Sequence, residues 1–408
     1  MRNIEELGKR LTVRYSLIMC FNIMGYCTMF SFASVYLLSR GFINSEIGVT
    51  LTLSSAFTIL LQPVVAAFAD KTKKLALRNI VAIILGIIGM VSFLLMVSPQ
   101  KVLPIVICYI IISALFSAQL PLLTSMSMEH INTGVPVNFS LARGIGSLAF
   151  AVLCSSLGFL VDAYGGWVIM LANIVISVVG VVLVSLFPKP QKTKLVNLEV
   201  KPEASNLVEF ALRNKTFMLV VISVAMIFFS HIVINSFTIQ IVNHIGGDNS
   251  DMGIAVAIAA FLELPAMAMF PWIYRKVRNA GLLLKVAGGF FVLKAVLTLF
   301  APTVAWFIVA QCFQFFAYAM LTPASVYYVN EVIPEADKNK GQMFMLMTGA
   351  ICGLIANLTS GFILDSNGGV RLMMEVGIAV SLAGLVMLML VIRSKDNGIK
   401  APEPLDIK

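Results

Sequence analysis

Three charged side chains lie deep inside long apolar stretches of this sequence: Arg143, Glu263 and Lys294. A charge in such a place is costly and normally faces a cavity or a partner. The planar guanidinium of Arg143 suits a pair of hydroxyls or a carboxylate. Glu263 is the only acidic residue near the middle of an apolar stretch, so it is the candidate for proton uptake and release. Lys294, on the next stretch, is the cation expected beside it.

Each of these residues also has a structural interpretation. Arg143 could be tied to backbone carbonyls or to Glu129, in which case it would only hold helices together. Glu263 and Lys294 could form a static ion pair. The types and positions of these residues leave both interpretations open.

Uncharged polar side chains form a second set of candidates. His231 and Asn235 are four residues apart, so they share one helix face. His231 is also the second candidate for proton coupling, because histidine titrates near neutrality. The predicted substrate site consists of Arg143, Lys294 and the following polar residues: Asn22, Tyr26, His231, Asn235, Gln311, Gln314 and Tyr318. Such side chains line cavities, but they also bond neighbouring helices.

The elements that must position these residues are membrane-spanning helices. Of the 408 residues, 59% are hydrophobic and only 12% are charged, with a mean hydropathy of +0.94. A soluble domain is about a quarter charged, so a soluble enzyme is excluded, and so is a disordered chain. Twelve stretches have the length and apolarity of a spanning helix: 11–38, 44–68, 78–98, 102–127, 138–161, 166–187, 216–242, 250–274, 281–301, 304–330, 340–364 and 370–393. The predicted fold class is an all-α integral membrane protein.

The net charge of +9 reflects membrane topology and does not indicate a nucleic-acid partner. With a cytoplasmic N-terminus, only Arg40, Lys101 and Arg371 fall on the outer side. The cytoplasmic segments then hold most of the Lys and Arg, including Lys9, Arg10, Lys71, Lys73, Lys74, Arg78, Arg275, Lys276, Arg278, Lys338, Lys340, Arg393 and Lys395. Both termini are therefore predicted to be cytoplasmic, in a multi-pass protein of the cell membrane. The first apolar stretch is too long for a signal peptide.

The motifs of catalysis are missing from the sequence. It contains no H-E-x-x-H, no P-loop glycine pattern and no Cys/His metal spacing. The six cysteines all fall inside apolar stretches and are interpreted as small buried hydrophobes. We therefore expect neither an enzyme, a metal nor a bound cofactor, and a gradient of protons or of substrate has to supply energy.

Two similar halves make up the chain. The predicted organisation is a six-helix bundle at 1–187, a cytoplasmic linker at 188–215, a second bundle at 216–393 and a cytoplasmic tail at 394–408. Paired motifs recur at an offset of 202 to 205 residues: NSEIG at 44–48 with NSDMG at 249–253, Pro63 with Pro265, Pro121 with Pro323, Glu129 with Glu331, and GFLVDAYGG at 158–166 with GFILDSNGG at 361–369. Two parallel six-helix repeats with a site between them are typical of the major facilitator fold.

These residues give the chain a resemblance to the major facilitator superfamily. Within it, the sequence resembles the group of lactose permease, nucleoside–proton symporters and phenylpropionate permeases. Gln62-Pro63 with AAFADKTKK at 66–74 is similar to the superfamily's loop between helices 2 and 3, which implies gating roles for Asp70, Lys71 and Lys74. Arg143-Gly144-Ile145-Gly146 and Glu263-Leu264-Pro265 resemble the group's motifs in helices 5 and 8, and the group's arginine grips substrate.

The sequence departs from the group at several positions. Thr124 stands where lactose permease has its sugar-binding carboxylate, so the resemblance adds Thr124 to the candidate substrate residues. Gln314 and Ala317 stand near the positions of its helix-10 histidine and glutamate. Lys294 replaces a helix-9 arginine. The galactoside and proton sites of lactose permease are therefore not reproduced.

The resemblance and the deep polar residues together predict a secondary transporter. Proton symport of a polar organic solute (a sugar, oligosaccharide or nucleoside) by alternating access is the leading hypothesis. Its expected partners are the small-molecule substrate, protons and the lipid bilayer, and a monomer is expected. The alternatives are a permease for organic anions such as aromatic acids, a drug efflux pump, and a non-transporting membrane receptor.

Overall fold

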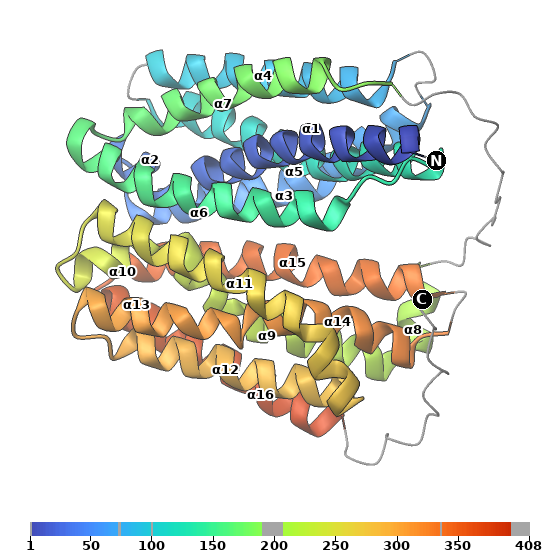
Figure 1. Cartoon of the computed structure of the whole chain (residues 1–408). Coiled ribbons are helices and arrows are strands. Elements are labelled where there is room, and N and C mark those ends of the chain that lie inside the picture. The colour runs from blue at the N-terminus through green and yellow to red at the C-terminus, as the bar shows by residue number, and fades with distance from the viewer. Residues whose placement is uncertain (1, 72–74, 99–100, 190–206, 335–336, 393–408) are drawn as a thin grey trace.

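The computed structural model describes residues 2–71, 75–98, 101–189, 207–334 and 337–392 (Figure 1). These residues form helices and no strand. Eleven helices are long and apolar enough to cross a membrane, and the number is twelve when one bent pair counts as a single span. The all-α integral membrane fold predicted from the sequence is confirmed.

The bounds of the helices follow the predicted stretches closely. In chain order the α-helices are α1 (Arg2–Tyr26), α2 (Ala33–Ser39), α3 (Asn44–Lys71), α4 (Leu77–Val97), α5 (Val102–Asn132), α6 (Phe139–Tyr164), α7 (Trp167–Ser185), α8 (Leu207–Arg213), α9 (Lys215–Ser236), α10 (Thr238–His244), α11 (Asn249–Val277), α12 (Ala280–Leu299), α13 (Val304–Cys312), α14 (Tyr318–Val332), α15 (Lys338–Leu364) and α16 (Gly369–Val391).

The first span is broken, whereas the sequence predicts a single helix over 11–38. Helix α1 begins at Arg2, nine residues before the predicted start, because charged residues that fail a hydropathy test can still form helix: Glu6 and Arg10 pair at 2.8 Å one turn apart. A π-helical segment, η1 (Cys27–Ser31), follows α1, and α2 then continues at an angle of 54°. Such π-helical turns interrupt a helix at one point and often mark functional sites.

The seventh and tenth spans are also interrupted. The seventh is divided between α9 and α10 at Phe237. In the tenth, a 3₁₀ turn, η2 (Phe313–Phe315), separates α13 from α14. A 3₁₀ turn has three residues per turn where an α-helix has 3.6, so it changes the direction of the side chains that follow. Gln314, a candidate site residue, lies inside this turn.

Figure 1 shows helices α1 to α7 above helices α8 to α16, with the start of α1 and the end of α16 on the same side of the molecule. We call that side the terminal end and the opposite side the distal end. The two halves meet through α6 packed on α11 and α3 packed on α15. The short helix α8 lies inside the segment predicted as a linker. The predicted tail at 394–408 lies outside the described residues.

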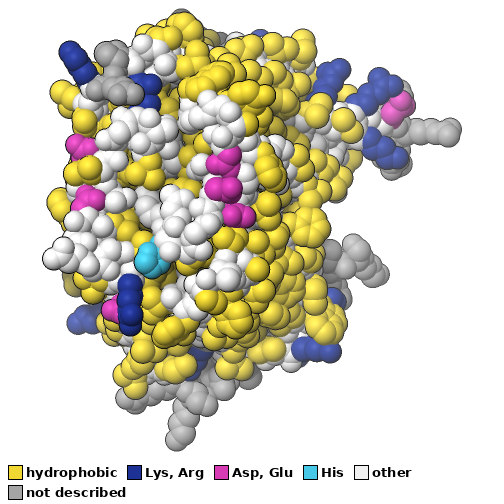
Figure 2. Space-filling view, turned by 90° about the vertical axis from the view of Figure 1, so that its left-hand side faces the viewer, with side chains coloured by type: hydrophobic (Ala, Val, Ile, Leu, Met, Phe, Trp, Pro, Cys, Tyr) yellow, Lys and Arg dark blue, Asp and Glu magenta, His cyan; other side chains and the backbone are white. Residues whose placement is uncertain are grey.

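The long helices present large apolar side chains on their outer faces. Leu60, Leu103 and Leu390 are each more than two-thirds exposed. A soluble protein rarely exposes apolar surface on this scale, whereas a bilayer covers it at no cost. Figure 2 shows this apolar surface continuing over the side of the molecule.

Candidate functional site

A chain of three polar side chains connects α12, η2 and α11. The ammonium Nζ of Lys294 donates to Oε1 of Gln314 at 2.7 Å, and Nε2 of Gln314 donates to Oε1 of Glu263 at 2.8 Å. Lys294 is 1% exposed and Gln314 is 4% exposed. Buried charges need such partners, and the amide satisfies both because its two ends have opposite polarity.

This geometry changes the predicted relation between Glu263 and Lys294. The sequence left open a static ion pair, but no ion pair joins the two residues within the described part of the chain. Gln314, in the 3₁₀ turn, lies between them and forms a hydrogen bond with each. Opposite charges separated by an amide still attract each other, yet they can be parted by moving one neutral side chain.

An aromatic cluster surrounds His231 of α9. Its ring stacks on Tyr318 with centroids 5.0 Å apart and meets the edges of Phe228 and Phe291 at 5.8 and 5.4 Å. Nε2 of His231 lies 3.0 Å from Nδ2 of Asn235, as expected for two residues on one helix face. Nδ1 of His231 is buried and has no hydrogen-bond partner. The cluster therefore combines a flat apolar surface with an unused polar atom.

The N-terminal half contains a second group of polar side chains, on α1 and α5. Nε2 of Gln119 donates to Oδ1 of Asn22 at 2.8 Å, which joins α5 to α1. Oε1 of Gln119 is buried without a partner. Tyr26, on the same helix as Asn22, stacks on Phe30 with centroids 4.0 Å apart. Gln119 is not among the residues predicted from the sequence, where its only signal is an amide in the middle of an apolar stretch.

Arg143 of α6 lies within electrostatic reach of both groups. Its charge acts on Tyr26 in its own half and on Glu263 and Tyr318 in the other half. Arg143 is exposed, and its side chain forms no hydrogen bond or ion pair with the described residues. The structural alternative, an arginine tied to Glu129, is not what the described contacts show. The fork of this guanidinium is free to bind a ligand.

The remaining candidates are less directly placed. Thr124 donates to the carbonyl of Leu120 in its own helix at 3.0 Å, as membrane-embedded threonines often do. Gln311 is 4% exposed, and its Nε2 has no hydrogen-bond partner. A buried amide without a partner is unfavourable, so a ligand or water that accepts a hydrogen bond there would be stabilised.

The predicted gating residues are placed only in part. Helix α3 extends to Lys71, so Asp70 and Lys71 belong to its last turn, although the sequence placed them in a loop. Lys74 lies outside the described residues.

The six cysteines form no disulfide, and Cys27 faces Cys154 with both side chains fully buried. No group of residues that could hold a metal ion occurs in the described ranges.

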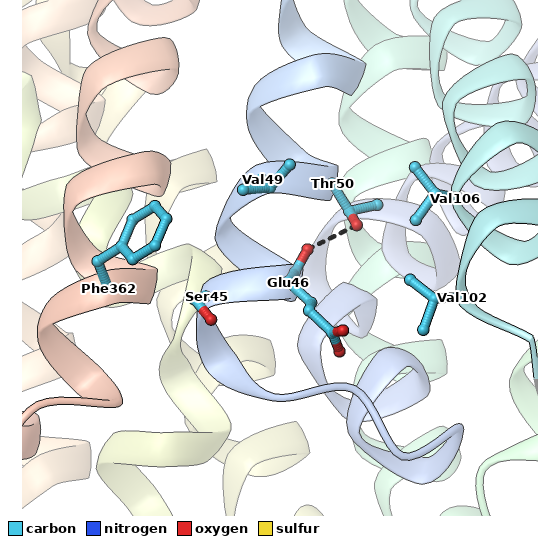
Figure 3. A pocket seen from close by; sticks show the side chains of 7 residues that line it. All are labelled: Ser45, Glu46, Val49, Thr50, Val102, Val106 and Phe362. Carbon is cyan, nitrogen blue, oxygen red and sulfur yellow. Dashed lines mark hydrogen bonds between the residues drawn. The ribbon is translucent and has the colours of Figure 1, made fainter.

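A separate pocket lies at the distal end, away from these residues (Figure 3). It has a volume of about 270 Å³ and is lined by Ser45, Glu46, Val49, Thr50, Val102, Val106 and Phe362. Most of its wall is apolar. The carboxylate of Glu46 is already used, because it accepts from the backbone N–H of Ile43 at 3.1 Å. This pocket offers little to a polar solute, and the central residues remain the candidate site.

The described helices are long and apolar enough to cross a membrane, and buried polar side chains lie among helices of both halves. The fold and the site define a multi-pass transporter of the major facilitator superfamily. The chain belongs to the MFS_1 like family, whose model matches residues 12–374. It is 23% identical over 377 residues to the maltose permease of Geobacillus stearothermophilus, which covers 91% of this chain and 92% of the permease. The predicted resemblance is thereby confirmed.

Solved structures share the fold. A crystal structure of a point mutant of the nucleoside transporter NupG superimposes with a TM-score of 0.82 at 15% identity, covering 94% of this chain and all of that one. An inward-facing, unoccupied bacterial homologue of the human lysosomal transporter Spinster superimposes with a TM-score of 0.68 at 10% identity, covering 94% and 96% of the two chains. At these identities the likeness shows the fold alone.

Proposed function

We propose that this chain is a proton-coupled symporter of a sugar, an oligosaccharide or a nucleoside, working by alternating access. The observation that carries the proposal is the Lys294–Gln314–Glu263 chain, which holds one acidic and one basic side chain apart by a neutral amide. Stacking surfaces at Tyr26 and Tyr318 and the free fork of Arg143 suit a ring that carries hydroxyls. The maltose permease and nucleoside transporter relatives support this class of substrate.

Coupling follows from the position of the amide. A substrate that hydrogen-bonds to Gln314 or Lys294 would replace one end of the chain and leave Glu263 without its donor. A carboxylate that loses its donor in a low-dielectric site is stabilised by taking up a proton. Proton uptake and substrate binding would then favour each other. Release on the other side would restore the amide contact and free the proton.

The test of coupling is uptake into vesicles with and without an imposed pH gradient. Glu263→Gln should abolish gradient-driven accumulation and keep exchange of labelled for unlabelled substrate, because only the proton site is lost. Glu375→Gln is the matched control, since Glu375 is half-exposed and paired with Arg371 outside the site. Accumulation by Glu263→Gln would show that Glu263 is not the coupling residue, and His231→Gln would then be the next variant.

A second candidate, an organic-anion permease, is favoured by the excess of cations. Arg143 and Lys294 face a single carboxylate, Glu263, and Arg143 has a free guanidinium. Thermal-shift screening against sugars, nucleosides and aromatic acids separates the two candidates. Stabilisation by an aromatic acid alone would favour the permease for anions. The stabilising compound should lose its effect on Arg143→Ala and keep it on Arg14→Ala, a variant near the terminal end.

We also propose that the terminal end faces the cytoplasm and that the protein is a monomer in the cell membrane. The basic residues support this orientation, because they gather at the terminal end and cytoplasmic loops carry the excess of Lys and Arg.

A further inference from the structure

The paired motifs of the two halves meet at the distal end, far from the central residues. Asp162 lies in GFLVDAYGG and Asp365 in GFILDSNGG, while NSEIG begins α3 and NSDMG begins α11. Each aspartate contacts the helix that belongs to the other half. Figure 2, which looks at the distal end, shows acidic side chains near the middle of this face.

Asp162, near the end of α6, accepts four hydrogen bonds from the first turn of α11. The backbone N–H groups of Asn249 and Ser250 reach its carboxylate at 3.3 and 2.7 Å. The side-chain amide of Asn249 adds a bond of 2.7 Å, and the hydroxyl of Ser250 adds a short one. One carboxylate therefore holds the N-terminus of a helix from the opposite half.

Asp365, directly after α15, repeats this arrangement on α3. The backbone N–H groups of Asn44 and Ser45 reach its carboxylate at 3.2 and 2.6 Å, and the side-chain amide of Asn44 reaches it at 2.9 Å. Oδ1 of Asn44 in turn accepts from Gln240 of α10 at 3.1 Å. Burial alone would raise the pKa of Asp365, but the hydrogen bonds from Ser45 and Asn44 outweigh burial and lower that pKa below the usual aspartate value. The carboxylate is therefore ionised at neutral pH.

The bonded N–H groups have no partner inside their own helices. The first N–H groups of a helix are unpaired, and the helix dipole attracts negative charge there. Helix α3 has Ile43 before it, which has no side-chain oxygen to cap it. Helix α11 has its own cap, Asp248, but that side chain accepts from Asp251 and leaves Asn249 and Ser250 to Asp162. In both helices, an aspartate from the other half of the molecule accepts hydrogen bonds from the unpaired N–H groups of the first turn.

Glycines bring the same helices into backbone contact. A Cβ added at Gly253 would lie 2.4 Å from the carbonyl oxygen of Cys154, and one added at Gly48 would lie 2.5 Å from that of Asn357. Separation of the halves at the distal end must therefore break these backbone contacts and both aspartate contacts. Figure 3 shows Ser45 at the beginning of α3 and Phe362 on the neighbouring α15.

We propose that Asp162 and Asp365 are two gate residues that hold the distal end of the transporter closed by capping α11 and α3 from the opposite half. In a cycle of alternating access, both carboxylates leave these helix starts when the distal end opens, and water takes their place. Removing either charge then shifts the protein toward the distal-open form. The inference rests on alternating access and not on the identity of the substrate or on proton coupling.

Hydrogen–deuterium exchange of the full chain tests this without any substrate or gradient. Asp162→Asn and Asp365→Asn should raise amide exchange over 44–52, 158–165, 249–257 and 358–364 by about 10- to 100-fold, the factor that charge-assisted hydrogen bonds correspond to. Exchange at the terminal end should fall, because one end closes as the other opens. The double variant should show the larger effect. Ser250→Ala, which removes a single hydroxyl bond, should show a smaller effect in the same direction.

Two matched controls remove a carboxylate from the same helix starts without crossing between the halves. Asp248→Asn and Glu46→Gln should raise exchange only in the first turn of their own helix. The proposal is overturned if the two gate variants also raise exchange only in that first turn, with the glycine contacts and the terminal end unchanged. Such a result would leave the symporter proposal intact, whereas gradient-driven accumulation by Glu263→Gln would contradict the coupling proposal and leave the gate proposal intact.

Discussion

Gln314 is the side chain on which the charge arrangement of the site depends. Among the described residues, its side chain accepts from Nζ of Lys294 and donates to Oε1 of Glu263. The three residues are each found from the sequence, which left open whether Lys294 and Glu263 pair directly and did not place Gln314 between them. The amide's position depends on two helices, α11 and α12, and on a 3₁₀ turn, and no pattern within a single stretch of sequence predicts how these three elements meet.

The first prediction is that Gln314→Leu lowers the free energy of unfolding by about 1–3 kcal/mol, because two buried charges each lose a hydrogen bond. Transport should be lost as well. Gln311→Leu is the matched control: its amide nitrogen has no partner, so its cost should be below about 1 kcal/mol. Thermal unfolding in detergent and substrate uptake measure the two effects. Equal stability of both variants would show that the amide does not hold the charges.

At the scale of elements, the sequence did not predict the interruptions in the first, seventh and tenth spans. Hydropathy gave the start of α11 within one residue and the start of α5 without error, because both depend on a local apolar run. The π-helical segment after Tyr26 and the 3₁₀ turn at Gln314 have the same apolar composition as regular helix. Tertiary packing decides these breaks, and both lie where candidate site residues are found.

The second prediction concerns the helix contact between α6 and α11. Gly253→Ala adds a methyl group 2.4 Å from the carbonyl oxygen of Cys154, so the helices must move apart at the distal end. We expect a lower melting temperature and faster amide exchange in the segment around Gly158. Gly289→Ala on α12 is the control, since nothing lies within 4 Å of the added atom. The Gly289→Ala variant should keep the melting temperature unchanged or raise it slightly, because alanine favours helix. Identical behaviour of the two variants would contradict the close contact.

At the scale of the whole molecule, the contacts between the repeats define which helix ends lie at the same end of the molecule. The charged residues then distinguish the two ends. The aspartate contacts show that the starts of α3 and α11 lie at one end with the ends of α6 and α15. At the distal end, the positive charge of Arg371 is paired with Glu375. At the terminal end, Lys276 lies 4.0 Å from the ring of Trp272, an arrangement that suits the membrane–water interface.

The last prediction is the orientation that follows from this asymmetry. Because cytoplasmic loops retain Lys and Arg, the terminal end should face the cytoplasm. A cysteine introduced by Asn367→Cys, at the exposed distal end, should react with a membrane-impermeant maleimide in intact cells. A cysteine introduced by Lys276→Cys should react only after permeabilisation, and a fluorescent protein fused after Lys408 should fluoresce in the cytoplasm. The native cysteines give the background, since all six are buried or half-buried. The reverse labelling pattern would invert the topology and would place the Asp162 and Asp365 contacts on the cytoplasmic side.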